Sequence, residues 1–275
     1  ERFDSYLTRY GFGQPTGIDL VGEIGGILPS PAAKLKLNKE RWYPGDLVNA
    51  AIGQGMWKVT PLQLARGTAA LADGGMLRRP HLVAAQRTHF DSPWEPLPQP
   101  APVRITENPE NLRVVQEGMQ MTIHGPGGTA RAMSVGAPYR MAGKTGTAQV
   151  VNRRAQAVNP KSLPLHQRHR ALFVGYAPAE NPTIAVAVMV EGGGYGGSTA
   201  APIARKIFDA HLLGKMPEGM EVEGDDAVSA PVMVGREIQV GVPAAVPASG
   251  TAASTQAAPA SSTPQPAVSV PEPRR

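Results

Sequence analysis

Three apolar segments follow one another between residues 139 and 191 with no helical pattern between them, and this succession constrains the fold most strongly. The segments cover residues 139–151, 171–177 and 183–191, and the last two are joined by a short turn at 178–182 that begins and ends in proline. A turn this short joins antiparallel strands, because a parallel connection needs a crossover of a dozen or more residues. The sequence therefore predicts an antiparallel sheet rather than a doubly wound parallel one.

Helical segments lie on both sides of these strands in the sequence. One is predicted over residues 2–10 and another at the C-terminal end over 198–213. Two more carry a start signal, an N-cap residue followed by proline at Thr60-Pro61 and at Asn108-Pro109, and end in glycine. Their order predicts an α+β fold with an antiparallel sheet flanked by helices. The residues expected on the inner faces are Leu64, Thr68, Leu71, Ala72, Leu112, Val115, Met119, Thr122, Ala200, Ile203, Ile207 and Ala210.

The segments between the helices are predicted to be less regular. Residues 14–46 are rich in glycine and proline and indicate an irregular surface excursion. Residues 76–85 resemble a short hairpin, and residues 92–102 resemble an exposed proline-rich link. Residues 1–215 are expected to form the folded part, whereas the Pro/Ala/Ser-rich residues 216–275 are expected to be a disordered tail, since they contain few large apolar side chains.

Charge and composition restrict the possible partners. The 275 residues include 27 Lys and Arg against 22 Asp and Glu, a formal net charge of +5 that favours mild attraction to anionic surfaces. Nucleic acid is not indicated, because the basic residues are scattered. The chain has no cysteine, so disulfides and thiolate metal sites are excluded. The one small basic cluster is interpreted as a loop without a metal site: Arg153, Arg154, His166, Arg168, His169 and Arg170.

The start of the chain suggests a longer polypeptide. Glu1 stands where a methionine would begin a protein, and it falls inside a predicted helix. No apolar run approaches the roughly 18 residues of a membrane span. We therefore expect the chain to be the C-terminal part of a longer protein, with any membrane anchor upstream.

The Lys-Thr-Gly-Thr sequence at residues 144–147 is the main candidate for a functional site. It places an ammonium and two hydroxyl groups inside a predicted strand, where Lys144 avoids a desolvation cost only by facing a polar cleft or an anion. Gly146 would allow close backbone approach by a ligand, since glycine otherwise weakens a strand. The sequence equally permits a lysine extending from an edge strand beside a glycine bulge.

Serine motifs that normally accompany such a sequence are absent from the chain. No serine is followed three residues later by lysine, and no Ser-x-Asn or Ser-x-Asp triplet occurs. Acyl transfer at a Lys-Thr-Gly site requires a serine nucleophile. We therefore expect the nucleophile to lie outside these residues and the chain alone to be inactive.

Four ordered blocks resemble the class B penicillin-binding proteins, and among them the elongation-specific transpeptidases, over residues 1–215. The blocks are Trp-Tyr-Pro-Gly-Asp at 42–46, Ile-Gly-Gln-Gly at 52–55, Thr-Pro-Leu-Gln-Leu-Ala at 60–65 and Lys-Thr-Gly-Thr-Ala-Gln-Val at 144–150. The resemblance implies a β-lactamase-like, five-stranded antiparallel sheet flanked by helices, here incomplete. It also implies a cofactor-free D-Ala-D-Ala transpeptidase or carboxypeptidase of peptidoglycan biosynthesis that works through a serine acyl-enzyme and serves cell elongation and shape.

The same resemblance assigns roles to the residues of the tetrad. Lys144 supplies positive potential for the substrate carboxylate, Thr145 and Thr147 bind that carboxylate, and Gly146 lets the acyl chain lie against the strand. The N–H of Thr147 forms half of an oxyanion hole, so Lys144 and Thr147 are the catalytic candidates. The implied partners are peptidoglycan stem peptides, β-lactam antibiotics, a membrane glycan polymerase and an elongation scaffold. The implied location is the periplasmic face of the bacterial inner membrane.

Two other functions remain open at this point. A phosphate-binding loop would share the Gly-Lys-Thr sequence at residues 143–145, but Pro138 stands where its first glycine should be. A non-catalytic remnant or scaffold module of the same fold would explain the missing serine motifs. Residues 192–197 are glycine-rich and could cradle an anion, although a flexible turn is the simpler interpretation. Gln54 is placed either near the cleft or in a purely structural turn.

Overall fold

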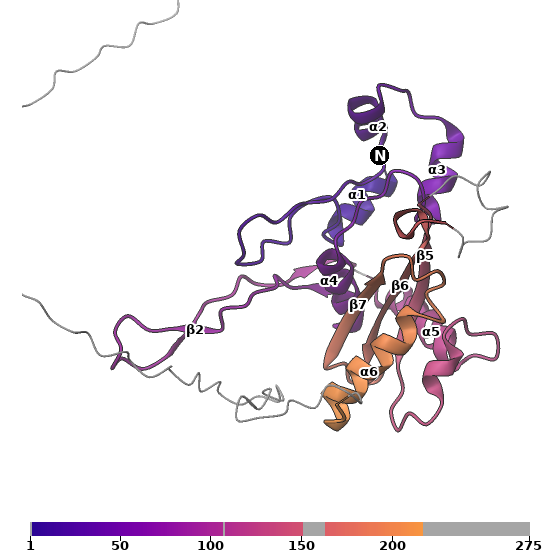
Figure 1. Cartoon of the computed structure of the whole chain (residues 1–275). Coiled ribbons are helices and arrows are strands. Elements are labelled where there is room, and N and C mark those ends of the chain that lie inside the picture. The colour runs from indigo at the N-terminus through magenta and orange to yellow at the C-terminus, as the bar shows by residue number, and fades with distance from the viewer. Residues whose placement is uncertain (1, 107, 151–162, 217–275) are drawn as a thin grey trace, which may run out of the picture. The chain divides into compact units, whose positions relative to one another are not determined.

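A three-stranded antiparallel sheet in the order β5–β6–β7 forms the centre of the fold (Figure 1). The computed structural model describes residues 2–106, 108–150 and 163–216. The strands are β5 (Ala142–Ala148), β6 (Arg170–Ala177) and β7 (Ile184–Val190). All three predicted strands are thus confirmed, although β5 is shorter than the predicted 139–151. The five-stranded sheet implied by the resemblance is represented by three strands among the described residues.

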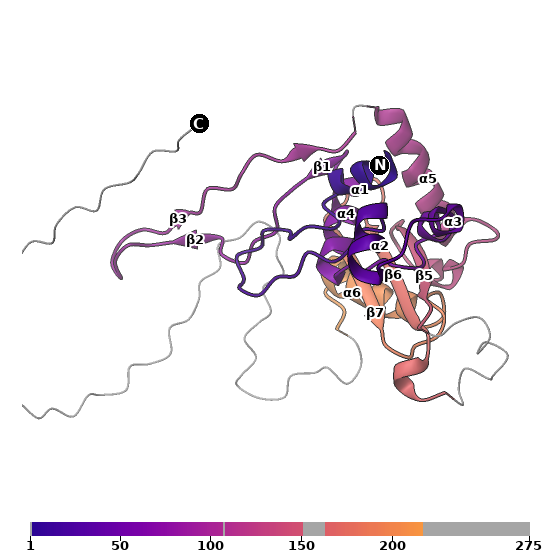
Figure 2. The same cartoon turned by 90° about the horizontal axis from the view of Figure 1, so that it is seen from above.

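Helices cover both faces of this sheet (Figures 1 and 2). On one face α6 (Ala200–Leu213) packs on β6 and β7. On the other face α4 (Pro61–Ala72) contacts β6 and β7, while α5 (Pro109–His124) contacts β5. Successive strand residues point to opposite faces, and accordingly Phe173 belongs to the core beside α6 whereas Tyr176 belongs to the core beside α4 and α5. The α+β class with flanking helices is confirmed.

The N-caps of α4 and α5 form as the sequence predicts. The Thr60 hydroxyl accepts a hydrogen bond from the Gln63 N–H, and the Gln63 side chain accepts one from the Thr60 N–H, which completes a capping box. The Asn108 side chain caps α5 by accepting a single hydrogen bond from the Glu110 N–H. The α5 helix ends at Gly125, as expected.

The inner faces of α5 and α6 differ in part from the prediction. In α6 the buried residues are small ones and one aromatic, Ala200, Ala201, Ala204 and Phe208, whereas Ile203 and Ile207 are 40% and 38% exposed. In α5 the buried residues include Ile123, whereas Val115 is 45% exposed. For α6 the prediction was Ala200, Ile203, Ile207 and Ala210, so Ala200 is confirmed and the rest of the predicted face is displaced by about one residue. Three alanines and Phe208 pack against the sheet, and the two isoleucines lie at the margin of this contact.

The predicted irregular excursion over residues 14–46 is wrong in part, because it contains one helix and the start of another. After α1 (Arg2–Arg9), the chain forms α2 (Pro31–Asn38) and α3 (Pro44–Ala51). Ser30 caps α2 through the Ala33 N–H, with Pro31 at the first helical position. Lys34 of α2 is 6% exposed and its Nζ lies 2.7 Å from a carboxylate oxygen of Asp46 in α3. This ion pair joins the two helices.

Two short strand pairs replace the predicted hairpin at residues 76–85 and the link at 92–102. Strand β1 (Met76–Leu77) pairs with β4 (Val103–Arg104), and β2 (Ala85–Gln86) pairs with β3 (Glu95–Pro96). Residues 76–85 therefore do not pair with themselves: β2 pairs with the segment predicted as a link, and β1 pairs with residues 103–104, just beyond it. The pairing of β2 with β3 is a local hairpin, whereas the pairing of β1 with β4 is a long-range contact that has no signature in the local sequence.

Short 3-10 helices complete the described residues, at η1 (Arg131–Ser134) and η4 (Leu165–Gln167). No helix in the described part of the chain is long and apolar enough to cross a membrane. Residues 217–275 lie outside the described residues, as do Arg153, Arg154 and residue 151. The boundary at residue 215 and the disordered tail stay predictions.

Candidate active site at the edge of the sheet

The Lys-Thr-Gly-Thr tetrad occupies the middle of β5, which is an edge strand among the described residues. Within the sheet β5 has only β6 as a neighbour, and the register places Thr145 opposite Phe173 and Thr147 opposite Ala171. Lys144 is exposed, while Thr145, Gly146 and Thr147 are half-buried. The tetrad is therefore accessible along the free edge of the sheet.

The pleat of β5 separates the side chains of the tetrad. Alternate residues share a face, so Thr145 and Thr147 lie on the α6 side with Phe173, and Lys144 and Gly146 lie on the α4 and α5 side with Ala142. The exposed ammonium of Lys144 is not desolvated. It turns along the strand and its Nζ donates a hydrogen bond of 2.8 Å to the carbonyl oxygen of Thr145.

Two backbone carbonyl groups of the tetrad accept hydrogen bonds from side chains. Besides the bond from Lys144 to Thr145, the Gln54 amide donates a hydrogen bond of 3.0 Å to the carbonyl oxygen of Thr147. In an antiparallel strand, the N–H and C=O groups of a residue point toward the same edge of the strand. The residues two positions before and after it point toward that edge as well. Both carbonyls therefore face the free edge, and the N–H groups of Thr145 and Thr147 face it with them.

Gln54 thus contacts the tetrad and also lies in a tight turn, so the structure combines the two alternatives that the sequence left open. It follows α3 in the Gly-Gln-Gly turn, where both Gly53 and Gly55 adopt positive φ. Its N–H donates to the Asn49 carbonyl oxygen at 2.9 Å, which fixes the turn to the end of α3. The side chain then reaches a residue 93 positions later in the chain.

A second threonine hydroxyl meets the tetrad from a loop that the sequence analysis did not single out. Thr129 follows α5, and its Oγ1 lies 2.7 Å from Oγ1 of Thr145. The only sequence signal is the glycine-rich run before it at residues 125–128, which was interpreted as a helix stop. The pairing with β5 is a tertiary contact and has no local signature.

The glycine-rich residues 192–197 join β7 to α6, as predicted, and also cover part of β5 and β6. A methyl group on Gly196 would collide with the carbonyl oxygen of Leu172 and lie 2.5 Å from that of Gly146. A methyl group on Gly197 would collide with the carbonyl oxygen of Thr129. This segment is also hydrogen-bonded, for example from the Gly194 N–H to the His169 carbonyl at 3.0 Å. Its glycines permit close approach to the tetrad.

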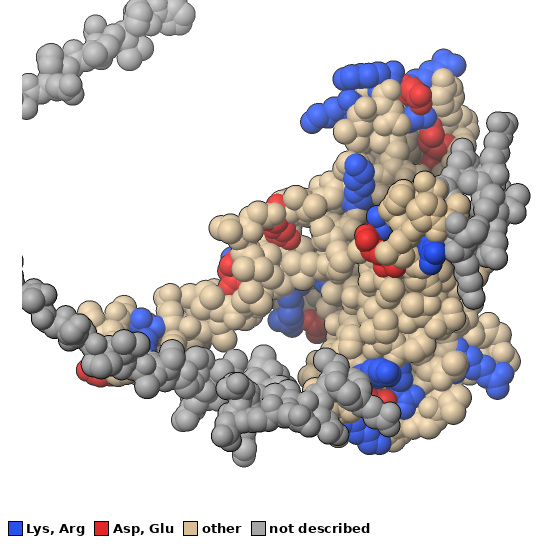
Figure 3. All heavy atoms as spheres, in the orientation of Figure 1, with Lys and Arg blue, Asp and Glu red and all other residues tan. Residues whose placement is uncertain are grey.

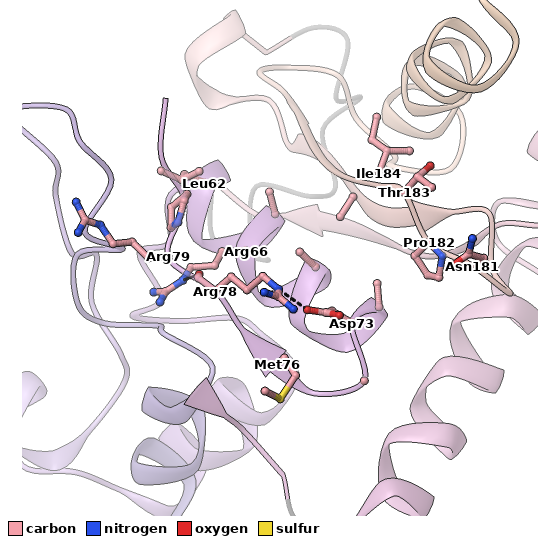
Figure 4. Close-up of a pocket in the computed structure, with 16 residues that line it drawn as sticks. Leu62, Arg66, Asp73, Met76, Arg78, Arg79, Asn181, Pro182, Thr183 and Ile184 are labelled. Carbon is pink, nitrogen blue, oxygen red and sulfur yellow. Dashed lines mark hydrogen bonds and ion pairs between the residues drawn. The ribbon is translucent and has the colours of Figure 1, made fainter. Parts of the chain in front are cut away.

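Other candidate features lie away from the tetrad. A hollow of about 830 Å³ lies between α4 and the start of β7, a strand that is separated from β5 by β6. Arg66, Arg78 and Arg79 line one side of it, and Arg78 pairs there with Asp73 (Figure 4). The chemistry of the tetrad therefore does not coincide with this hollow.

Charge and metal-binding groups give no competing site in the described ranges. Lys and Arg form separate groups divided by uncharged surface on the face drawn in Figure 3. Within residues 2–106, 108–150 and 163–216, no cluster of three or more His, Asp or Glu side chains could hold a metal ion. His166 lies in η4 and His169 directly precedes β6. The phosphate-loop hypothesis fails because β5 continues as a strand through Ala148, where that loop would open a helix.

Comparison with known proteins identifies the family. The model of the penicillin-binding protein transpeptidase domain matches residues 1–209. The chain belongs to the penicillin-binding protein transpeptidase family. The peptidoglycan D,D-transpeptidase MrdA of Salmonella typhimurium strain LT2 is 38% identical over 215 residues, which are 78% of this chain and 34% of that protein. The chain thus spans about a third of the length of the curated relatives that it matches.

Solved structures of transpeptidases have the same fold. Penicillin-binding protein 2 of Pseudomonas aeruginosa, in complex with WCK 5153, is 42% identical with a TM-score of 0.62, and the match covers 79% of this chain and 46% of that one. Penicillin-binding protein 2 of Helicobacter pylori, in complex with MreC, is 30% identical with a TM-score of 0.60, and the match covers 76% and 35%. The resemblance to the penicillin-binding proteins is thus confirmed, and both of these similar structures are of penicillin-binding protein 2.

Proposed function

We propose that this chain forms the C-terminal part of the active site of a peptidoglycan D,D-transpeptidase that acts in cell elongation and shape maintenance. The observation that carries the proposal is the arrangement at β5. Two threonine hydroxyls, two free-edge N–H groups and an ammonium group lie along one accessible strand edge. Such an edge pairs with an extended peptide through main-chain hydrogen bonds and binds an anionic terminus through hydroxyl and ammonium donors.

In this proposal the reaction is acyl transfer through a serine that lies outside the chain. The serine oxygen attacks the carbonyl carbon of the penultimate D-Ala of a stem peptide, and the terminal D-Ala leaves with the proton that the serine gives up. An amine of a neighbouring stem peptide then attacks the acyl-enzyme and restores the serine hydroxyl. Water in place of the amine would give D-Ala-D-Ala carboxypeptidase activity.

Each residue of the tetrad has a role that fits its position. Thr145 and Thr147 donate hydrogen bonds to the terminal carboxylate, and exposed Lys144 adds positive potential at the same edge. The N–H of Thr147 stabilises the oxyanion of the tetrahedral intermediate. The contact from Gln54 supports the role of the Thr147 N–H. Its side-chain amide donates a hydrogen bond to the Thr147 carbonyl oxygen and so fixes the peptide group that follows Thr147. Gly146 leaves room for the acyl chain.

Ligands, partners and location follow from the same assignment. β-Lactam antibiotics would acylate the same serine and place their carboxylate against the two threonines. A membrane glycan polymerase and an elongation scaffold are the proposed protein partners, and the complex of the Helicobacter pylori relative with MreC supports a scaffold partner. An upstream segment would anchor the protein at the periplasmic face of the inner membrane.

The alternative is a non-catalytic remnant or scaffold module of the same fold. The absence of Ser-x-x-Lys and Ser-x-Asn sequences from the 275 residues favours it. The two proposals differ in what precedes the chain. A catalytic protein requires a Ser-x-x-Lys sequence upstream in the same reading frame, whereas a remnant does not.

Fluorescent penicillin labelling distinguishes these proposals. We expect no covalent label on residues 1–275 alone. We define the extended protein as this chain continued upstream in its own reading frame to include a Ser-x-x-Lys sequence, and we expect its serine to be labelled. Lys144→Ala in the extended protein should slow labelling at least tenfold. Covalent labelling of the chain alone, or an upstream sequence without the serine motif, would overturn the catalytic proposal.

A further inference from the structure

Thr129 is the residue near the tetrad to which neither the family match nor the sequence pattern assigns a role. Its Oγ1 lies 2.7 Å from Oγ1 of Thr145, a normal distance for a hydrogen bond between two hydroxyl groups. Thr129 is exposed and Thr145 is half-buried, so a ligand can still reach the pair. The contact joins the loop after α5 to the proposed carboxylate site.

The loop that carries Thr129 is fixed on both sides. Toward α5, the Ala130 N–H donates to the Thr122 carbonyl at 3.0 Å, and a side chain on Gly128 would collide with the same carbonyl oxygen. Toward α6, Gly197 packs so closely on the Thr129 carbonyl that it has no room for a methyl group. Thr129 is therefore held in place before any ligand arrives, which is the condition for an effective positioning group.

The two hydroxyl groups together leave one proton free to bind an anion. Each threonine hydroxyl has one proton to donate and can accept from a neighbour. If Thr129 donates to Thr145, the proton of Thr145 remains free for the ligand. A donor that itself accepts a hydrogen bond is polarised and donates more strongly. The chain of donors then runs from Thr129 to Thr145 and from Thr145 to a carboxylate.

We propose that Thr129 is a positioning residue that orients the Thr145 hydroxyl as a donor to the terminal carboxylate of the peptide or penicillin. This inference rests on the proposed function of the tetrad. Thr129 acts through Thr145 and does not contact the ligand itself. Removing its hydroxyl should therefore weaken only reactions in which a charged carboxylate is recognised.

The test measures acylation of the extended protein by a penicillin with a free carboxylate and by its methyl ester. Thr129→Val removes the hydroxyl at nearly constant volume. We expect it to lower the second-order acylation rate with the carboxylate form about tenfold, because Thr145 without its orienting partner loses a hydrogen bond to a charged group. The rate with the methyl ester should not change. Thr129→Ser retains the hydroxyl and should behave as the unsubstituted protein.

A double-mutant cycle separates positioning from direct contact. In the Thr145→Val background, Thr129→Val should have no further effect, because its only target is gone. Additive losses would show that Thr129 binds the ligand directly, and equal losses with the ester would show a merely structural role; either result overturns the inference and leaves the proposed function standing. If the unsubstituted extended protein is not labelled at serine, the proposed function fails and the inference fails with it.

Discussion

Gly196 and Gly118 differ in the space available for a side chain. Gly196 packs against the backbone of β5 and β6, where a methyl group would lie 2.5 Å from the Gly146 carbonyl oxygen. Gly118 lies within α5, and a methyl group there would have no atom within 4 Å. Close packing therefore requires a glycine at position 196, whereas the glycine at position 118 only weakens the helix.

Alanine at these two positions should therefore change stability in opposite directions. We expect Gly196→Ala to lower the free energy of unfolding by about 1–3 kcal/mol, because the backbone it meets must shift. We expect Gly118→Ala to raise it by about 1 kcal/mol through helix propensity. Denaturant unfolding of the 275-residue chain measures both. Equal effects would contradict the close packing of residues 192–197 on β5.

Individual residues of the site could be predicted where neighbouring residues in the sequence indicate their function. Lys144, Thr145 and Thr147 could be named because the tetrad is contiguous and unusual in a strand. Thr129 could not be named, since its partner is 16 residues away and the intervening chain has no periodic pattern. Gln54 was a candidate only because it stands between two glycines in a predicted turn.

His124 shows how one side chain ties two elements together. It is the last residue of α5, and its Nε2 accepts a hydrogen bond of 3.1 Å from the N–H of Met141, just before β5. Burial lowers the pKa of His124 below its usual value near 6.5, and the positive charge of Arg140 acts in the same direction. A neutral ring is required, because a protonated imidazole has no acceptor nitrogen.

The stability of the chain should therefore depend on the protonation of His124. A histidine with a lowered folded-state pKa contributes stability above its unfolded pKa near 6.5, and this contribution is lost as the pH falls through the folded-state pKa. His124→Gln should reduce the loss of unfolding free energy between about pH 7 and 5. His166→Gln, at an exposed position, should leave it unchanged. Identical pH profiles for all three proteins would contradict the prediction.

Element boundaries were predictable where capping signals were used, and the same signal was overlooked elsewhere. Ser30-Pro31 begins α2 with the residue types that marked α4 and α5. The glycine and proline residues around this start signal favoured an irregular segment instead. In the structure, those residues form the turns between short helices. The inner face of α6 was misjudged for another reason: apolar residues occur around much of the helix, so the sequence pattern alone did not fix which of them face the sheet.

In the described residues the central sheet ends in two edge strands, β5 and β7, which have no further strand beside them and differ in character. The β5 edge carries polar groups that suit a peptide ligand. The β7 edge belongs to a continuous apolar strand of seven residues, and Met189 within it is 43% exposed. Natural proteins usually protect such an edge with charge or with further structure, because unpaired N–H and C=O groups recruit other strands.

The chain should therefore self-associate through β7, and a charge there should reduce the association. We expect Met189→Lys to shift the 275-residue chain toward monomer in sedimentation velocity, since a lysine on an edge strand opposes pairing with a second copy. Met121→Lys is the matched control, because Met121 is 64% exposed in α5 and the substitution adds the same charge outside any strand. A chain that is monomeric without substitution, or an equal shift with both lysines, would show that the β7 edge is not the associating surface. The expected result is that Met189→Lys alone reduces association. That result would identify β7 as the edge at which the sheet pairs with further strands.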